Sequence, residues 1–164
     1  MKTVAATTAI EDIDAFLADI EAISDATGAA VQCFDADYVA GERHLRRAVA
    51  LAERAREQGT AVAHDPAIEI LLYAAGRRQI NQALDMGVDA GETDVAGVVT
   101  GGDEAAAAER LAERLGGEAD SAVGSGDRET ITAFFDIGDA ELAVVDGDLE
   151  AVVLERVALL DVQK

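Results

Sequence analysis

A helical pattern between Asp65 and Met86 constrains the fold of this chain more than any other segment. Asp65 can accept amide hydrogen bonds as an N-cap, and Pro66 suits the first helical position, where the donor that proline lacks would have no partner. The apolar residues that follow fall on more than one side of the helix, so we expect this helix to be buried nearly all round. Gly76 breaks it, and a second helix is expected from Arg78 to Met86.

Turn residues and apolar periodicity predict the elements around this buried helix. The expected strands are Lys2 to Thr7, Ala29 to Phe34, Asp94 to Thr100 and a candidate fourth near Ala119 to Val123. The other expected helices are Glu11 to Ala26, Glu42 to Gln58, Asp103 to Leu115, Asp127 to Phe135 and Asp148 to about Leu160. Because strands and helices mix without strict alternation, we predict an α+β fold, a single compact domain over residues 1–164 with a small β-sheet packed with several α-helices.

The charge of the chain is strongly negative, with 33 acidic residues against 13 basic ones and a net charge of −20. The acids are spread over every expected helix rather than gathered in a tail, which favours a halophilic surface. One segment departs from this pattern. Between Arg43 and Arg78, seven arginines stand against four acidic residues, a local balance of +3, so the remainder of the chain carries −23. We interpret this basic stretch as a retained binding surface.

Cysteine usage and hydropathy indicate the compartment. Cys33 is the single cysteine, which excludes an internal disulfide and suggests a reducing environment. The first residues lack a continuous apolar segment, and no apolar run approaches the length that spans a membrane. We therefore predict a soluble, cytoplasmic protein with no membrane partner.

The sequence offers no constellation that would carry a reaction. The two histidines and the one cysteine are not spaced like the ligands of a zinc site. The glycine-rich segment Gly97 to Gly102 lacks the Lys-Ser/Thr ending of a P-loop, and Asp103 would place a negative charge where a phosphate should bind, which favours a plain strand-to-helix turn. We expect a protein that is not an enzyme and has no catalytic residues, metal, cofactor or small-molecule substrate.

The residues directly after Gly76 have the chemistry of a nucleic-acid contact. Arg77 and Arg78 can form forked hydrogen bonds with phosphate or stack on bases, Gln79 can read a base edge, and Ile80 can provide an apolar floor. The alternative is that the arginines cap the preceding helix and that Ile80 and Leu84, which share a helix face, are core residues; we expect this of Leu84. Both interpretations remain open for Ile80.

The arginines of the helix from Glu42 to Gln58 are less informative. Arg43 and Arg47 lie one helical turn apart, and Arg54 falls on the same side two turns further on. Neighbouring acids partly compensate their charge. A solvated helix face explains this pattern as well as a binding surface does.

Five sequence blocks together resemble a known family. They are Tyr38 to Leu45, Glu69 to Leu71, Gly76 to Ile80, Leu115 to Glu118 and Leu154 to Leu160. In this order they are similar to the Cgi/TPRKB family, the small non-catalytic subunit of the KEOPS complex. The resemblance covers essentially the whole chain, and the Arg-Gln-Ile triplet that starts at Arg78 is its most distinctive part.

The resemblance implies a function. KEOPS makes the threonylcarbamoyl-adenosine of tRNA, and this subunit binds and regulates the small atypical kinase, an ATPase, and helps to recruit tRNA through its single-stranded 3′ CCA end. Catalysis belongs to the other subunits. Carried over by position, the residues expected to contact tRNA are Arg77, Arg78, Gln79 and Ile80, with His44 and Arg47 as weaker neighbours. The alternative is a purely structural protein–protein adaptor without RNA binding, whose basic stretch pairs with an acidic partner.

Overall fold

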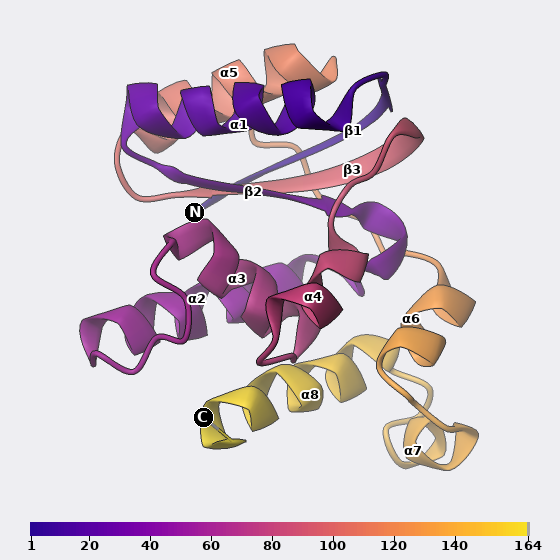
Figure 1. The fold of residues 1–164 in the computed structure, drawn as a ribbon. Coiled ribbons are helices and arrows are strands. Elements are labelled where there is room, and N and C mark those ends of the chain that lie inside the picture. The colour runs from indigo at the N-terminus through magenta and orange to yellow at the C-terminus, as the bar shows by residue number, and fades with distance from the viewer. Residues whose placement is uncertain (164) are drawn as a thin grey trace. The chain divides into compact units, whose positions relative to one another are not determined.

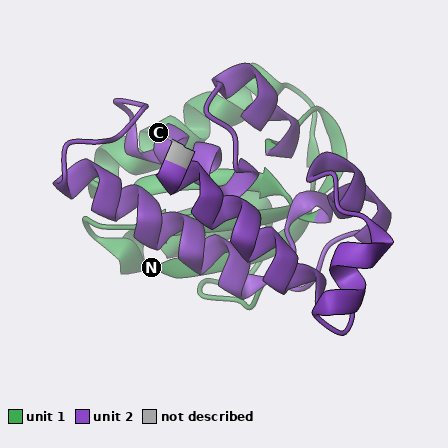
Figure 2. Cartoon of the chain, turned by 90° about the horizontal axis from the view of Figure 1, so that it is seen from below, with its two compact units in different colours: residues 1–36, 87–123 green, residues 37–86, 124–164 purple. Residues whose placement is uncertain are grey.

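The computed structural model describes residues 1–163 and divides into two compact units. Unit 1 comprises residues 1–36 and 87–123, and unit 2 comprises residues 37–86 and 124–164 (Figure 2). Both units are therefore built from two separate segments of the chain. The organisation of residues 1–164 as a single domain stays a prediction. Within the described residues, no helix combines the length and the hydropathy needed to cross a membrane.

Unit 1 is a three-stranded antiparallel sheet with α1 and α5 on one face (Figure 1). The strands follow the spatial order β1-β3-β2, so β3 lies in the middle. Their bounds are β1 Lys2–Ile10, β2 Ala30–Asp35 and β3 Gly91–Thr100, and those of the helices are α1 Ile13–Thr27 and α5 Glu104–Leu115. The core of this unit forms between the sheet and the two helices, with buried side chains that include Val4, Phe16, Val31, Val99 and Leu111.

The glycine-rich segment at the end of β3 serves close backbone packing. Gly97 lies opposite Val4 on β1 and Cys33 on β2, and a Cβ atom there would approach Leu111 of α5 to 2.7 Å. Gly102 has a φ of +52°, and a Cβ atom on it would lie 2.4 Å from the carbonyl carbon of Gly28. The segment is thus the strand-to-helix turn that we expected, and its glycines let α5 and the turn after α1 approach it.

Unit 2 is built from helices. Their bounds are α2 Glu42–Glu57, α3 Pro66–Ala75, α4 Ile80–Ala83, α6 Arg128–Phe134, α7 Asp139–Val144 and α8 Leu149–Gln163. The α3 helix packs against α2, α4 and α8, and every residue from Glu69 to Ala75 is buried. The expectation of a helix buried nearly all round is confirmed, together with its Asp65 N-cap and its end at Gly76. This central helix positions the segment that follows it.

The α+β fold class is confirmed, but three local expectations are wrong. No strand forms near Ala119 to Val123, because Asp120 adopts a left-handed conformation with φ of 55° that a strand cannot contain. Ser121 instead binds the edge of β1, where its hydroxyl accepts a hydrogen bond from the amide of Ala5 at 2.9 Å. The expected helix from Arg78 to Met86 is reduced to α4 and a following 3-10 turn, Leu84–Met86.

The third error concerns the core. Leu84 was expected to be a core residue with a shared apolar face, yet 55% of its surface is exposed. The sequence did not predict the short α7 helix, in which Leu142 is the one buried residue.

Glycine substitutions test the packing of the β3–α5 turn. We expect Gly102→Ala to lower the free energy of unfolding by about 2–4 kcal/mol, because the new methyl group meets backbone atoms that cannot move aside and the left-handed φ adds strain. Gly124→Ala is the matched control, since a Cβ atom there meets nothing within 4 Å. Urea denaturation would measure the free energy of unfolding of both variants. For Gly124→Ala it should change by no more than about 0.5 kcal/mol. Equal stabilities of the two variants would contradict this account.

Candidate functional site at the junction of α3 and α4

The end of α3 fixes the direction in which the candidate segment leaves the helix. Gly76 has a left-handed φ of 61°, its amide donates to the carbonyl oxygen of Tyr73 at 3.1 Å, and the amide of Arg77 donates to that of Leu72 at 3.1 Å. This pair of hydrogen bonds is a Schellman motif, which ends a helix and turns the chain sharply. A Cβ atom on Gly76 would lie 3.2 Å from the carbonyl oxygen of Arg156 on α8, so the junction packs closely on that helix.

Arg77 points back into unit 2 rather than to solvent. Its guanidinium lies 4.8 Å from the centroid of the Phe134 ring, and its Nη2 group donates a short hydrogen bond to the carbonyl oxygen of the same residue. The side chain is half-buried. Arg156 binds the next carbonyls of this end of α6, with Nε at 3.2 Å from the oxygen of Phe135. Two arginines therefore cap the α6 C-terminus, a favourable place for positive charge.

The next three residues, Arg78, Gln79 and Ile80, are exposed. Among residues 1–163, the Arg78 side chain has no ion-pair or hydrogen-bond partner. Gln79 occupies the N-cap position of α4, yet its side chain makes no capping hydrogen bond, so its amide group is available to a partner. Ile80 is 46% exposed, so the alternative in which it belongs to the core is wrong.

His44 supports the junction from the interior. The residue is completely buried, with Nδ1 accepting a hydrogen bond from the amide of Ala40 at 3.0 Å and Nε2 lying 2.8 Å from the carbonyl oxygen of Ala74. This pattern requires a neutral ring with its proton on Nε2. Burial lowers the pKa of His44, against the opposing effects of the Ala74 carbonyl and the Glu150 carboxylate. His44 thus holds the last turn of α3 in place and is not itself on the surface.

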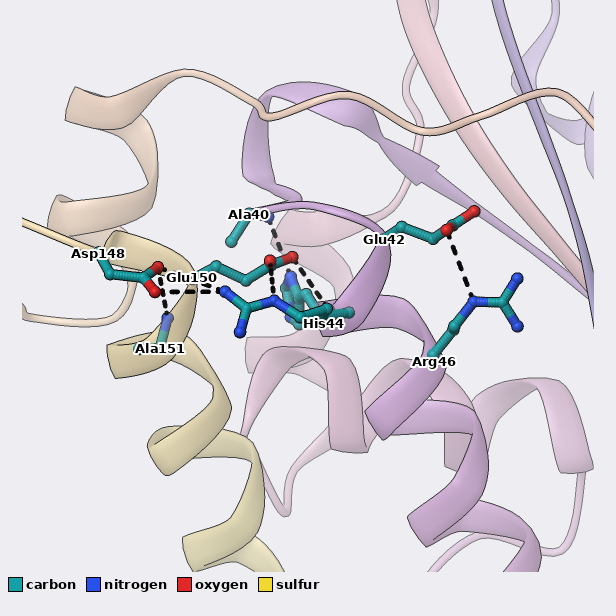
Figure 3. A network of polar contacts seen from close by, with 8 residues as sticks. Ala40, Glu42, His44, Arg46, Asp148, Glu150 and Ala151 are labelled. Carbon is teal, nitrogen blue, oxygen red and sulfur yellow. Dashed lines mark hydrogen bonds and ion pairs between the residues drawn. The ribbon is translucent and has the colours of Figure 1, made fainter.

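The N-terminus of α2 is capped by a residue that lies far away in the sequence (Figure 3). The Glu150 carboxylate accepts hydrogen bonds from the His44 amide at 3.3 Å and from Arg43 Nε at 2.6 Å. Arg43 also pairs with Asp148 at 3.3 Å. A Cβ atom on Gly41 would lie 2.2 Å from a Glu150 oxygen, so the glycine leaves the space that this carboxylate occupies. Glu150 thereby satisfies an amide that α2 cannot satisfy by itself.

The basic stretch is mostly engaged within unit 2. Five of its seven arginines have partners, namely Arg43 with Glu150 and Asp148, Arg46 with Glu42, Arg54 with Asp161, Arg56 with the His64 carbonyl and Arg77 with Phe134. In the part of the chain that the structure describes, Arg47 and Arg78 are the two members of the stretch without such a partner, and both are exposed. The positive segment seen in the sequence therefore leaves two arginines open to a partner.

Sequence reasoning missed two residues that shape this site, Phe134 and Glu150. A signal for Phe134 was present, because two of the four phenylalanines are adjacent at the end of α6 and aromatic residues are scarce in the chain. Phe134 also packs edge-on against Tyr38, with ring centroids 5.5 Å apart. No signal marked Glu150, since acidic residues are everywhere. Within residues 1–163, no group of three or more histidine, cysteine, aspartate or glutamate residues is placed to hold a metal ion.

Comparison with known proteins identifies the family. The family model described as kinase binding protein CGI-121 matches residues 9–161. The chain therefore belongs to this family, which confirms the family suggested by the sequence blocks. The description of the family makes kinase binding the function that members share. No curated protein matches the chain.

The buried ring of His44 should make stability depend on pH. Because the folded-state pKa is lowered, the unfolded chain binds a proton first as pH falls, so the contribution of His44 is complete above about 6.5 and is lost below it. We expect a loss of up to about 1.4 kcal/mol in unfolding free energy per pH unit below 6.5, until the lowered folded-state pKa is reached.

Urea denaturation over this pH range would measure the pH dependence of the free energy of unfolding. The titration of the many carboxylates also contributes to this dependence. His44→Gln should remove the part of the pH dependence that is due to the imidazole, at some cost in stability. His64→Gln is the matched control, because His64 is the other histidine of the chain and is exposed. If wild type and His44→Gln lose stability in parallel as the pH falls, the imidazole has no such role.

Neighbouring arginines should differ in their effect on folding. We expect Arg77→Ala to lower the free energy of unfolding by about 1.5–3 kcal/mol, because it removes a charge-assisted hydrogen bond and a cation–π contact. Arg78→Ala should change it by no more than about 0.5 kcal/mol, since Arg78 is exposed. Thermal and urea unfolding of the two variants provide the comparison, and a larger loss for Arg78→Ala would reverse the roles assigned to the two residues.

Proposed function

We propose that this chain is a non-catalytic subunit of the KEOPS complex, which modifies tRNA with threonylcarbamoyl-adenosine. In this proposal it binds and regulates the small kinase or ATPase subunit and recruits tRNA through the single-stranded 3′ CCA end. The proposal also places the protein in the cytoplasm, without a cofactor or a small-molecule substrate of its own. Kinase binding is the description of the family, and the other parts of the proposal go beyond it.

One observation carries the RNA part of the proposal. In a chain with a net charge of −20, an arginine without an ion-pair partner in residues 1–163 is followed directly by an unengaged amide side chain and an exposed isoleucine. Arg78 can bind phosphate or stack on a base, Gln79 can donate to and accept from a base edge, and Ile80 can contact the face of a base. These are the interactions through which proteins hold unpaired nucleotides.

The six residues expected to bind tRNA divide into three roles. Arg78, Gln79 and Ile80 are the direct contacts. Arg77 and His44 hold the junction in place from within unit 2, as their hydrogen bonds to Phe134 and Ala74 support. Arg47, exposed on α2, is a further phosphate contact.

The acidic surface is compatible with RNA binding if the protein works in concentrated salt. Carboxylates spread over the surface repel RNA at long range in dilute buffer. In molar salt the Debye length falls to about 3 Å, which screens this repulsion and leaves short-range contacts to decide affinity. We therefore propose a halophilic protein whose RNA contacts are local.

A purely structural adaptor is the second candidate function. The observation that favours it is the engagement of five of the seven arginines within the protein, which leaves little positive charge for a polyanion. An adaptor would bind the kinase and be indifferent to the CCA end of tRNA. The two functions therefore differ in a property that can be measured.

Filter binding with intact tRNA and with tRNA that lacks its CCA end separates them. We expect wild type to prefer the intact tRNA, and Arg78→Glu to weaken this binding by about tenfold or more, since a charge-assisted contact becomes a repulsive one. Arg110→Glu on α5 is the matched control for the change in net charge, because Arg110 is also exposed. Retention of the kinase in a pull-down would show that the variants are folded. If Arg78→Glu binds both tRNAs as wild type does, the site assignment fails.

A further inference from the structure

The loop that joins α2 to α3 holds a pocket at the N-terminal end of α3, opposite to the junction with α4 (Figure 1). The ten residues of α3 place these two regions about 15 Å apart. The pocket encloses about 370 Å³, a size that suits a small ligand or a few side chains of a peptide. Its lining consists of Arg56, Gly59, Ala61, Val62, Ala63 and His64.

The loop is held in shape from within unit 2. Glu69 of α3 is completely buried, and its carboxylate accepts hydrogen bonds at 3.1 Å from the amides of Val62 and Ala63. At the start of the loop, the amide of Thr60 donates to the carbonyl oxygen of Ala55 on α2 at 2.8 Å. A buried carboxylate needs such donors, so Glu69 and the loop hold each other in place. The pocket is therefore formed before any ligand binds.

The positive charge in this pocket is not neutralised. Arg56 donates from Nη1 to the carbonyl oxygen of His64 at 2.8 Å, and within residues 1–163 its side chain makes no other hydrogen bond or ion pair. Because a carbonyl carries no net charge, Arg56 keeps its own charge and a second edge, formed by Nε and Nη2. Two neighbouring acids are bound elsewhere, Asp65 to the amide of Ala67 and Glu69 to the inner side of the loop. No acidic residue of the described chain lines the pocket.

The chemistry of the lining selects the kind of anion. The open edge of Arg56 matches the two oxygens of a carboxylate, and the exposed His64 imidazole can donate a hydrogen bond in either charge state. Val62 is 48% exposed and offers an aliphatic contact beside these donors. The lining includes no phenylalanine or tyrosine on which a nucleobase could stack. Its complement is a carboxylate next to an aliphatic side chain, as in a peptide that places glutamate or aspartate beside leucine, isoleucine or valine.

We propose that Arg56, Val62 and His64 form a binding site for an acidic and aliphatic peptide segment of a protein partner. The carboxylate of the peptide binds to Arg56 and His64, and its neighbouring aliphatic side chain packs on Val62. This site is separate from the exposed segment after α3 and requires neither RNA nor the kinase. It gives the chain a second interaction surface, and a partner bound there leaves the α3–α4 junction open.

Two blocked tripeptides that differ in one group test the proposal, acetyl-Leu-Glu-Leu-amide and acetyl-Leu-Gln-Leu-amide. Each is titrated into the ¹⁵N-labelled full-length chain, and the amide resonances of residues 59–64 are followed by NMR. We expect the glutamate peptide to shift these resonances and to bind about tenfold more tightly than the glutamine peptide, because hydrogen bonds to a charged acceptor are stronger than those to a neutral one. Val62→Ala should weaken the binding of both peptides by the same factor, since it removes an apolar contact.

Two arginine variants locate the carboxylate. Arg56→Gln keeps a donor for the His64 carbonyl but removes the charge, so it should bind both peptides equally. Arg46→Ala is the matched control, because Arg46 is an exposed arginine of the same helix that already pairs with Glu42 at 3.6 Å. It should bind both peptides as wild type does. Unchanged resonances outside the loop would show that each variant is folded.

Three outcomes would overturn the proposal. Equal affinity of wild type for the two peptides, or no binding of either, means that the pocket does not recognise a carboxylate. A preference for the glutamate peptide that survives in Arg56→Gln places the carboxylate somewhere else. Inorganic phosphate that shifts the same resonances and displaces the glutamate peptide at lower concentration than the peptide itself requires makes the pocket a phosphate site. None of these measurements involves RNA or the kinase, so each outcome leaves the proposed function standing.

Discussion

The arrangement of unit 2 depends on the two hydrogen bonds of the buried His44 imidazole. The last four carbonyls of a helix have no partner within it, and at the end of α3 the amides of Gly76 and Arg77 satisfy two of them. His44 satisfies a third, that of Ala74, while its other nitrogen holds the chain before α2 at Ala40. One ring therefore joins two helices at the place where the exposed segment begins. The surface at Arg78 owes its geometry to groups that no partner can touch.

The arginines of this acidic chain mainly form ion pairs and hydrogen bonds within the protein. With 33 acidic residues available, an arginine on any helix readily finds a carboxylate, as Arg43 and Arg54 do on α8. Carbonyl groups at helix ends attract others, as Arg77 and Arg156 show at α6. A cluster of positive charge in the sequence is thus a poor measure of positive surface. Within residues 1–163, Arg78 and Arg47 are the two arginines of the basic stretch without a hydrogen-bond or ion-pair partner, and Arg78 is the one at the α3–α4 junction.

Local rules explain why the sequence predicted α3 well and the site less well. The Asp65 cap, Pro66 and Gly76 act within a few residues, so the bounds of the helix could be predicted from them. The role of Arg77 depends on Phe134, 57 residues further on, and nothing in its neighbourhood indicates that contact. The exposure of Leu84 likewise depends on which side of α4 meets α3. Periodicity predicts that a face is apolar, but packing decides whether it is covered.

The cap of α2 has a consequence for how the protein is made. Glu150 follows His44 by 106 residues, and the second segment of unit 2 is residues 124–164. A ribosome that adds about 5–20 residues per second would need roughly 5–20 s to supply the cap after α2 has been synthesised. Throughout that interval the nascent helix carries an open amide terminus and lacks α8 to pack against. Completion of unit 2 therefore waits until residues 124–164 have been synthesised.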